Sequence, residues 1–372
     1  MDPQPGVPDQ PFSATSSPPR NSLQLPEGPL RVIVEQPRSF WGKLIGRLLW
    51  IGLAVLVLVV INQQAMYKEY FHTSGEEVQE KYHSLNKLAT DKVAIIEIEG
   101  TIISGDGFVK KQIDRVREDK NVKAVVLRVN SPGGTVTGSD YIYHHLKQLI
   151  KDRQIPMVVS MGSLAASGGY YVSMAVGDDE KRIYAEPTTW TGSIGVIIPH
   201  YDISGLLEKW SVEDDSIASG PLKQMLSPTR KADDALRDRE QAVVKNLVDE
   251  CFAGFKHIVL DSRPALRNDQ ALQDTVFTGQ IFTAQQAHKN GLVDEIGFVE
   301  DAIDRAVELA NLSKDSVRVV KYKQPLGVFS ELIGATAGER SSRIDVGQLL
   351  DLTAPRAYFL CTWLPGVITT AR

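Results

Sequence analysis

One serine stands where the chain could present a nucleophile. Ser167 follows the apolar run 155–160, which has the composition of a buried parallel strand, and it precedes a helix expected from about Tyr170. Its neighbours are alanines and glycines, whose small side chains let another backbone approach the hydroxyl. A helix start also offers free N–H groups where an oxyanion would form. The alternative is that Ser167 only caps the helix, because serine is a favoured N-cap residue.

A serine nucleophile needs a base, because a free hydroxyl attacks weakly. None of the seven histidines indicates a Ser-His-Asp triad, and His200 with Asp202 nearby is more typical of a surface contact. A lysine can serve when burial in a dry site lowers its pKa towards about 7–8. Lys223 is the candidate, since its near neighbours in 219–226 are apolar or small and none is charged. A surface role for Lys223 stays open on this evidence.

Two glycines could supply backbone donors to the same chemistry. Gly133 and Gly134 follow a second predicted strand, 124–129, and one N–H aimed at a transition-state oxyanion is worth about 3–4 kcal/mol. A plain turn is the simpler alternative. The sequence has no His-x-x-x-His pattern and only two cysteines, so it indicates neither a metal site nor a disulfide framework.

The elements that must position these residues alternate along the chain. Strands are expected at 93–98, 124–129, 155–160, 182–185 and 193–198, and helices at 109–117, from a cap at Ser139, at 232–259 and at 298–312. This order, with short loops, predicts an α/β fold with mainly parallel pairing.

The N-terminal region predicts a membrane anchor. Residues 1–43 form a Pro-rich N-terminal segment with a basic flank, predicted to be disordered, and 44–65 are apolar enough to cross a bilayer. A helical stalk is expected over 66–91, the folded domain over 92–324, and a tail with an apolar contact segment over 325–372. The basic flank places the N-terminus in the cytoplasm, so the domain is expected to be periplasmic or otherwise extracytoplasmic, on a single-pass anchor in the inner (cytoplasmic) membrane.

Several segments, in order and at compatible spacing, carry a family resemblance. They are Asn130-Ser131-Pro132-Gly133-Gly134, Ser163-Leu164-Ala165-Ala166-Ser167-Gly168-Gly169, Thr191-Gly192-Ser193-Ile194-Gly195, Ser219-Gly220 with Lys223, and Gly291-Leu292-Val293-Asp294-Glu295. Over residues 90–310 the chain resembles the signal peptide peptidase A (protease IV) family of membrane-bound Ser-Lys peptidases. A departure is Gln280, where the family pattern has an arginine after Gly279.

The resemblance implies a role for each candidate residue. Ser167 would be the nucleophile, Lys223 the general base and Ser193 the hydroxyl that orients the lysine, while Gly134 and Gly168 would form the oxyanion hole. It also implies a Clp-protease/crotonase-like fold, a spiral of ββα units, and a reaction that needs no metal and no cofactor.

The resemblance further implies the partners. Each motif occurs once, so the chain is similar to the short form of the family, a homo-oligomeric ring in which serine and lysine of one site come from adjacent subunits. The implied substrates are signal-peptide remnants and other apolar peptides in the lipid bilayer. Nucleic acid is not expected, because the net charge is −5. A Ser-Lys peptidase dedicated to one membrane protein and a non-catalytic peptide-binding scaffold stay open as alternatives.

Overall fold

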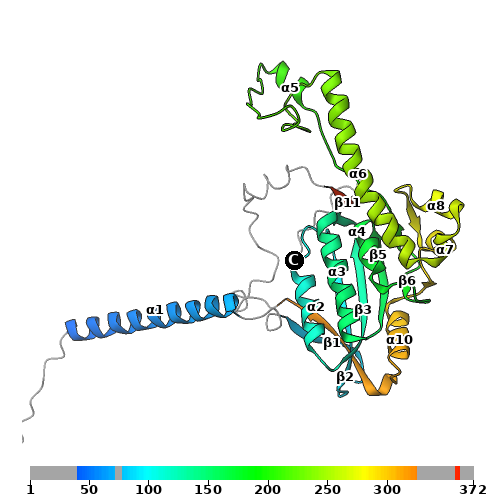
Figure 1. Cartoon of the computed structure of the whole chain (residues 1–372). Helices are drawn as coiled ribbons and strands as arrows, with labels where there is room; N and C mark the ends of the chain where they lie inside the picture. The colour runs from blue at the N-terminus through cyan, green and yellow to red at the C-terminus, as the bar shows by residue number, and fades with distance from the viewer. Residues whose placement is uncertain (1–39, 72–77, 325–356, 361–372) are drawn as a thin grey trace, which may run out of the picture. The chain divides into compact units, whose positions relative to one another are not determined.

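The computed structural model describes residues 40–71, 78–324 and 357–360, and the chain divides into two units, Met1–Tyr70 and Phe71–Arg372 (Figure 1). In the first unit, α1 (Phe40–Phe71) contains an exposed stretch, Ile45–Gln64, with a mean hydropathy of 2.3. By length and composition this stretch can cross a membrane, although a signal sequence would meet the same criteria. Most of the Pro-rich N-terminal segment and most of the tail lie outside the described residues.

A mixed sheet forms the centre of the second unit. Its long strands β2 (Asp91–Glu99), β3 (Val122–Ser131) and β5 (Met157–Ala166) pair in parallel, in the overall order β1-β10-β2-β3-β5-β6-β9. The other strands are β1 (Gln79–Leu85), β4 (Gly133–Thr135), β6 (Ile183–Ala185), β7 (Trp190–Gly192), β8 (Ile281–Thr283), β9 (Glu295–Ile296), β10 (Val317–Lys323) and β11 (Tyr358–Leu360). The predicted α/β fold with mainly parallel pairing is confirmed.

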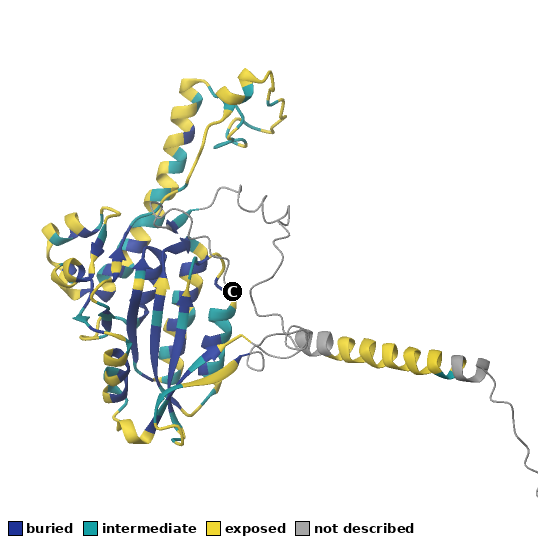
Figure 2. Cartoon of the chain, turned by 180° about the vertical axis from the view of Figure 1, so that it is seen from behind, coloured by how far each residue is buried: buried dark blue, intermediate teal, exposed yellow. Residues whose placement is uncertain are grey.

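Helices cover both faces of this sheet. The helices are α2 (Phe108–Glu118), α3 (Val136–Arg153), α4 (Gly168–Ser173), α5 (Ser204–Lys209), α6 (Asp234–Ser262), α7 (Pro264–Arg267), α8 (Gln270–Val276), α9 (Ala284–Lys289) and α10 (Val299–Leu309). One face packs Val93, Val126 and Val158 against Ala302 and Ala306 of α10. The opposite face packs on α2, α3 and α4, and the strands between the two layers are buried (Figure 2). The apolar runs of β2, β3 and β5 follow from this burial on both sides.

The expected helical stalk over 66–91 is wrong in its C-terminal part. Residues Gln79–Leu85 form β1, which pairs antiparallel with β10 at the sheet edge, and Val78 belongs to the core. The folded domain therefore begins before residue 92. The strand has no apolar alternation because most of its side chains are exposed, and this polar composition led to the helical interpretation.

Two further expectations are corrected locally. The cap of α3 is Thr135, whose hydroxyl accepts the Gly138 N–H at 3.0 Å, whereas Ser139 lies inside the helix and donates to the Thr135 carbonyl. The strand expected over 193–198 is replaced by the earlier strand β7, because the pairing with β5 ends at Gly192. Within 193–198, Ile197 forms an isolated bridge to Tyr358.

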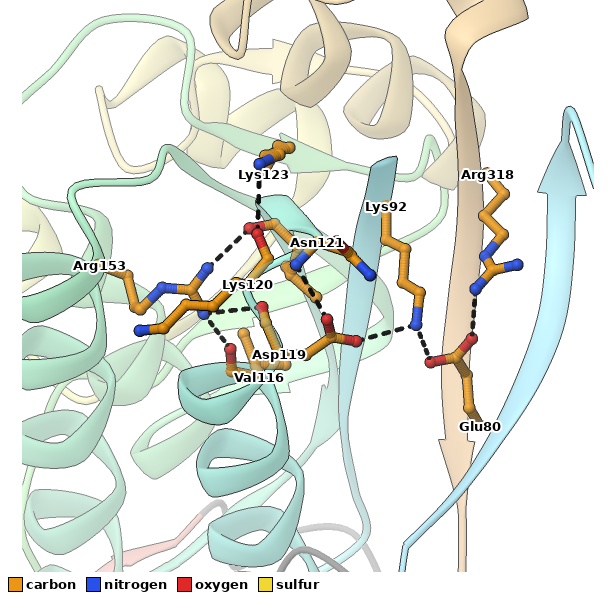
Figure 3. A network of polar contacts seen from close by, with 10 residues as sticks. Glu80, Lys92, Val116, Asp119, Lys120, Asn121, Lys123, Arg153 and Arg318 are labelled. Carbon is orange, nitrogen blue, oxygen red and sulfur yellow. Dashed lines mark hydrogen bonds and ion pairs between the residues drawn. The ribbon is translucent and has the colours of Figure 1, made fainter. Parts of the chain in front are cut away.

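A buried lysine ties the edge of the sheet to the end of α2 (Figure 3). Lys92 of β2 donates to Glu80 of β1 at 2.6 Å and to Asp119 at 2.9 Å. Asp119 also accepts the Asn121 N–H at 2.9 Å. Burial alone would raise the pKa of Asp119, but the hydrogen bonds and charge of Lys92 and the Asn121 amide outweigh it and lower that pKa.

This carboxylate makes the stability of the fold depend on acid pH. Because the pKa of Asp119 is lower in the folded state, its contribution is complete above the ordinary value of about 3.9 and is lost as the pH falls through the folded value. We expect the free energy of unfolding of the Asp119→Asn chain to fall less steeply than that of the natural chain below about pH 4. Urea unfolding at a series of pH values measures this slope, and parallel curves for the two chains would contradict the prediction.

A second buried ion pair joins α6 to β6. Arg263, at the end of α6, bonds Asp294 and donates through Nε to the Gly291 carbonyl at 2.8 Å. The second oxygen of Asp294 accepts the N–H groups of Arg182 and Ile183 at 2.8 and 2.9 Å. The base of α6 is therefore fixed to the sheet by one carboxylate.

The other end of α6 carries an arm that leaves the sheet. We define the arm as residues 200–250, which contain α5 and the first part of α6 and lie away from the strands in Figures 1 and 2. Its ion pairs are internal, and they include those between Arg230 and Glu240 and between Lys231 and Glu208. The apolar stripe of α6 is buried only near its base, at Phe255 and Val259, whereas Leu247 is exposed.

Candidate active site

Ser167 sits on a sharp turn between β5 and α4. Its N–H donates to the Gly192 carbonyl at 2.8 Å, and its carbonyl accepts the Tyr171 N–H at 2.8 Å. These two bonds hold the backbone at φ 55° and ψ −114°, in a region that residues other than glycine rarely adopt. Strain of this kind is typical of a nucleophile placed at a strand-to-helix turn.

The hydroxyl of Ser167 is buried and has no hydrogen-bond partner among the described residues. The residue is 1% exposed, and its Oγ forms no hydrogen bond within the part of the chain that the structure describes. In particular, it makes no capping bond to the N-terminus of α4. The interpretation of Ser167 as a simple helix cap is therefore wrong, and its buried oxygen is free for chemistry.

The glycines beside Ser167 bring two backbone amides together. A Cβ on Gly168 would lie 3.1 Å from the Gly134 nitrogen, and a Cβ on Gly133 would lie 2.6 Å from the Gly168 nitrogen. Gly133 has a φ of +97°, and a Cβ on Gly134 would lie 1.8 Å from the Ile102 carbonyl oxygen. Larger residues would separate β4 from α4, so glycine is what lets Gly134 and Gly168 converge.

Ser193 is brought to the same site. It directly follows Gly192, whose carbonyl binds the Ser167 N–H, and it is 8% exposed with a φ of 51°. Its own N–H donates to the Gln280 carbonyl at 2.7 Å. Because this bond uses the backbone of Gln280, the departure from the family's arginine leaves the support of Ser193 intact.

Lys223 is not brought to Ser167 within one chain. It lies in the turn 221–226 of the arm, and its side chain is exposed. The backbone contacts of this turn stay within the arm, as in the bond from the Lys223 N–H to the Gly220 carbonyl at 3.1 Å. The structure thus assembles Ser167, Ser193, Gly134 and Gly168, and places the predicted base elsewhere.

The tail contributes a strand that sequence reasoning did not place at the site. β11 pairs antiparallel with β4 in the register Tyr358 to Thr135, Phe359 to Gly134 and Leu360 to Gly133. On its other side, Tyr358 exchanges two backbone bonds with Ile197, at 2.9 and 3.0 Å. The apolar composition of 357–364 indicated a packing or subunit contact but gave no sign of its partner.

Comparison with known proteins identifies the chain's relatives. Residues 150–313 match Peptidase family S49, and residues 77–190 match Clp protease. The putative protease slr0021 of Synechocystis is 38% identical over 244 residues, which cover 65% of this chain and 83% of the relative. The chain belongs to peptidase family S49.

Two further relatives agree with this membership. A putative signal peptide peptidase SppA of Enterococcus faecium is 39% identical over 57% of this chain and 58% of its own length. Protease 4 of Haemophilus influenzae is 31% identical over 61% of this chain, and the match spans only 36% of that longer protein. The resemblance inferred from the motifs is confirmed, as is the Clp-protease-like fold, and an S49 chain with such relatives is a serine-type peptidase.

Proposed function

We propose that this S49 peptidase is a membrane-anchored endopeptidase that degrades signal-peptide remnants and similar apolar membrane peptides through a Ser-Lys dyad. The observation that carries the proposal is the strained turn at Ser167. Its buried hydroxyl has no hydrogen-bond partner among the described residues and lies near the backbone amides of Gly134 and Gly168. A buried hydroxyl with two backbone amides close by suits acyl transfer.

The proposed reaction has two steps. Lys223 takes the proton of Ser167 as Oγ attacks the substrate carbonyl carbon, and the oxyanion accepts the N–H groups of Gly134 and Gly168. When the C–N bond breaks, the Lys223 ammonium protonates the leaving amine and an acyl-enzyme remains on Ser167. Water, deprotonated by Lys223, then hydrolyses the ester. Ser193 would orient the lysine by accepting a hydrogen bond from its ammonium.

In this proposal the lysine comes from a neighbouring subunit of a homo-oligomeric ring. Lys223 is exposed on an arm that also exposes large apolar side chains, including Trp210 at 70% and Ile217 at 101%. Exposed apolar side chains gathered on one segment suit burial against a second copy. A second copy would deliver Lys223 to the buried hydroxyl of Ser167 and shield its side chain from water.

The anchor places this reaction near its substrates. α1 would cross the inner membrane once, with the basic flank and N-terminus in the cytoplasm and the peptidase unit outside it. Peptides left in the bilayer would then reach the site from the same membrane. A peptidase dedicated to one membrane protein would use the same site, whereas a peptide-binding scaffold would leave the unpartnered hydroxyl of Ser167 without a role.

Cleavage of a synthetic signal-peptide remnant in detergent tests the proposal. We expect the natural chain to cut the peptide and the Ser167→Ala chain to be inactive, because the acyl-enzyme needs the hydroxyl. Ser163→Ala is the matched control, since Ser163 is exposed on the same strand and should leave the rate unchanged. Cleavage by the Ser167→Ala chain would contradict the assignment of the nucleophile. Inactivity of the natural chain in its assembled state would favour the dedicated peptidase or the scaffold.

A further inference from the structure

We propose that Ser131 is a positioning residue of the oxyanion hole, whose hydroxyl sets the direction of the Gly134 N–H without touching the substrate. This inference rests on the proposed function, in which that N–H stabilises the oxyanion. Its evidence is one buried hydrogen bond, the two bonds that fix the following peptide group and the contact between Ser131 and α4.

The hydroxyl of Ser131 closes the turn between β3 and β4. Ser131 is fully buried, and its Oγ accepts the Gly133 N–H at 3.1 Å. A serine hydroxyl that accepts from the N–H two residues later takes the place of a backbone bond in a turn. Pro132 has no N–H, so Gly133 carries the first backbone donor after Ser131. The side chain of Ser131 therefore decides where this donor is held.

Two backbone bonds fix the next peptide group, which joins Gly133 to Gly134. The Gly133 carbonyl accepts the Ile102 N–H at 2.8 Å, and the Thr135 N–H donates to the Ile102 carbonyl at 2.8 Å. In the usual trans peptide group the C=O and the N–H point in opposite directions, so the Gly134 N–H points away from Ile102. Gly133 has a φ of +97°, which glycine tolerates but does not enforce. The Ser131 hydroxyl supplies that constraint at the start of the turn.

Ser131 also lies against α4, which carries the second proposed donor. A Cβ on Gly169 would lie 2.8 Å from the Ser131 carbonyl oxygen and 3.4 Å from the Ser131 Cβ. Ser131 pairs in register with Ala165, two residues before the nucleophile. Its hydroxyl does not reach that nucleophile, because the Ser167 Oγ has no hydrogen-bond partner among the described residues. Ser131 therefore acts on the reaction through Gly134 and not as a base for Ser167.

The Ser131→Ala chain tests the inference with the signal-peptide remnant in detergent. Loss of the acceptor releases the Gly133 N–H, and the Gly134 N–H then loses its fixed direction. Removing one oxyanion donor altogether costs about 10²–10³ in kcat. Because the donor is here displaced and not removed, we expect kcat to fall by about tenfold or more while KM stays unchanged.

A peptide aldehyde gives a second measure of the same donor. The Ser167 Oγ adds to the aldehyde carbon while its proton passes to Lys223, and the carbonyl π pair becomes a tetrahedral oxyanion in the same hole. We expect the Ser131→Ala chain to bind the aldehyde about tenfold or more weakly than the natural chain. In Ser167→Ala chains, where no adduct forms, the same substitution should leave the affinity for a fluorescein-labelled remnant unchanged.

Ser173→Ala is the matched control. Ser173 of α4 is also fully buried, and its Oγ donates to the Gly169 carbonyl at 2.8 Å, so this substitution removes one hydroxyl bond near the site without releasing a donor of the turn. It should leave kcat and the aldehyde affinity unchanged. Equal kcat and aldehyde affinity for the Ser131→Ala and natural chains would overturn the inference, as would equal losses in the Ser131→Ala and Ser173→Ala chains.

Ser131→Cys covers the case in which Ser131→Ala does not fold. A thiol fills nearly the same space but accepts a hydrogen bond more weakly, so we expect a smaller fall in kcat with KM again unchanged. Full kcat in a folded Ser131→Cys chain would overturn the inference in that case. A natural chain that binds the aldehyde but cuts no remnant would instead contradict the proposed function, and the aldehyde affinities would still decide the role of Ser131.

Discussion

Ser167→Ala and Lys223→Ala chains are each expected to lose about 10⁴-fold or more in kcat, and to recover activity when they are mixed in one oligomer. Each substitution removes a group that the proposed dyad cannot replace. In a mixed oligomer, however, an intact Ser167 from one subunit can meet an intact Lys223 from its neighbour. Random mixing of equal amounts would restore about a quarter of the sites, because each residue is intact in half of the subunits.

Co-expression of the two differently tagged chains, purified through both tags, measures this recovery with an apolar peptide substrate. Lys231→Ala is the control for the arm, since Lys231 is exposed there and pairs with the exposed Glu208. A mixed oligomer of normal size with no more activity than either parent would refute a site shared between subunits. It would also require Lys223 to reach Ser167 of its own chain, or another base to act.

Asp294→Ala should cost about 3–5 kcal/mol of unfolding free energy, since removing one partner leaves a buried charge uncompensated. The Arg263 side chain is only 7% exposed, and its guanidinium would keep the Gly291 carbonyl but lose its carboxylate. The N–H groups of Arg182 and Ile183 would also lose their acceptor, which places the cost at the upper end of the range. Urea unfolding of the chain at neutral pH measures the loss.

Asp178→Ala provides the matched comparison. Asp178 pairs with Arg267 at 2.9 Å near the same end of α6, but both side chains are largely exposed, at 56% and 40%. Solvent screens such an exposed pair, so we expect a much smaller loss of unfolding free energy than for Asp294→Ala. Similar losses for the two variants would show that burial does not set the cost at Asp294.

Burial explains which parts of the fold could be predicted from sequence. β2, β3 and β5 lie between two helical layers, so their apolar runs are continuous and were recognised. β1 is a polar strand at the edge of the sheet, and it is held there by backbone pairing with β10. Its side chains do not alternate between apolar and polar, so its sequence gives no sign of a strand. Thr135 was missed as a cap because Ser139, four residues later, fits the same composition rule.

In the candidate site, too, some residues could be predicted from the sequence and others could not. Ser167, Ser193, Gly134 and Gly168 are marked by small residues at strand ends, since close backbone approach requires them, and the structure brings them together. The neighbours of Lys223 in sequence cannot reveal the partner that we propose for it on another chain. The place of Phe359 was also beyond prediction, because its pairing with β4 spans more than two hundred residues and is specified by backbone bonds.

The positive φ at Ser167 restricts which nucleophiles this scaffold can ever accommodate. With φ held at 55° by two backbone bonds, position 167 tolerates an unbranched Cβ far better than a branched one. Threonine, which would preserve the hydroxyl chemistry, adds the methyl group that this geometry disfavours, whereas cysteine keeps the shape and changes the reacting atom. Conversion to a thiol peptidase is therefore sterically simpler than the chemically conservative exchange of one alcohol for another.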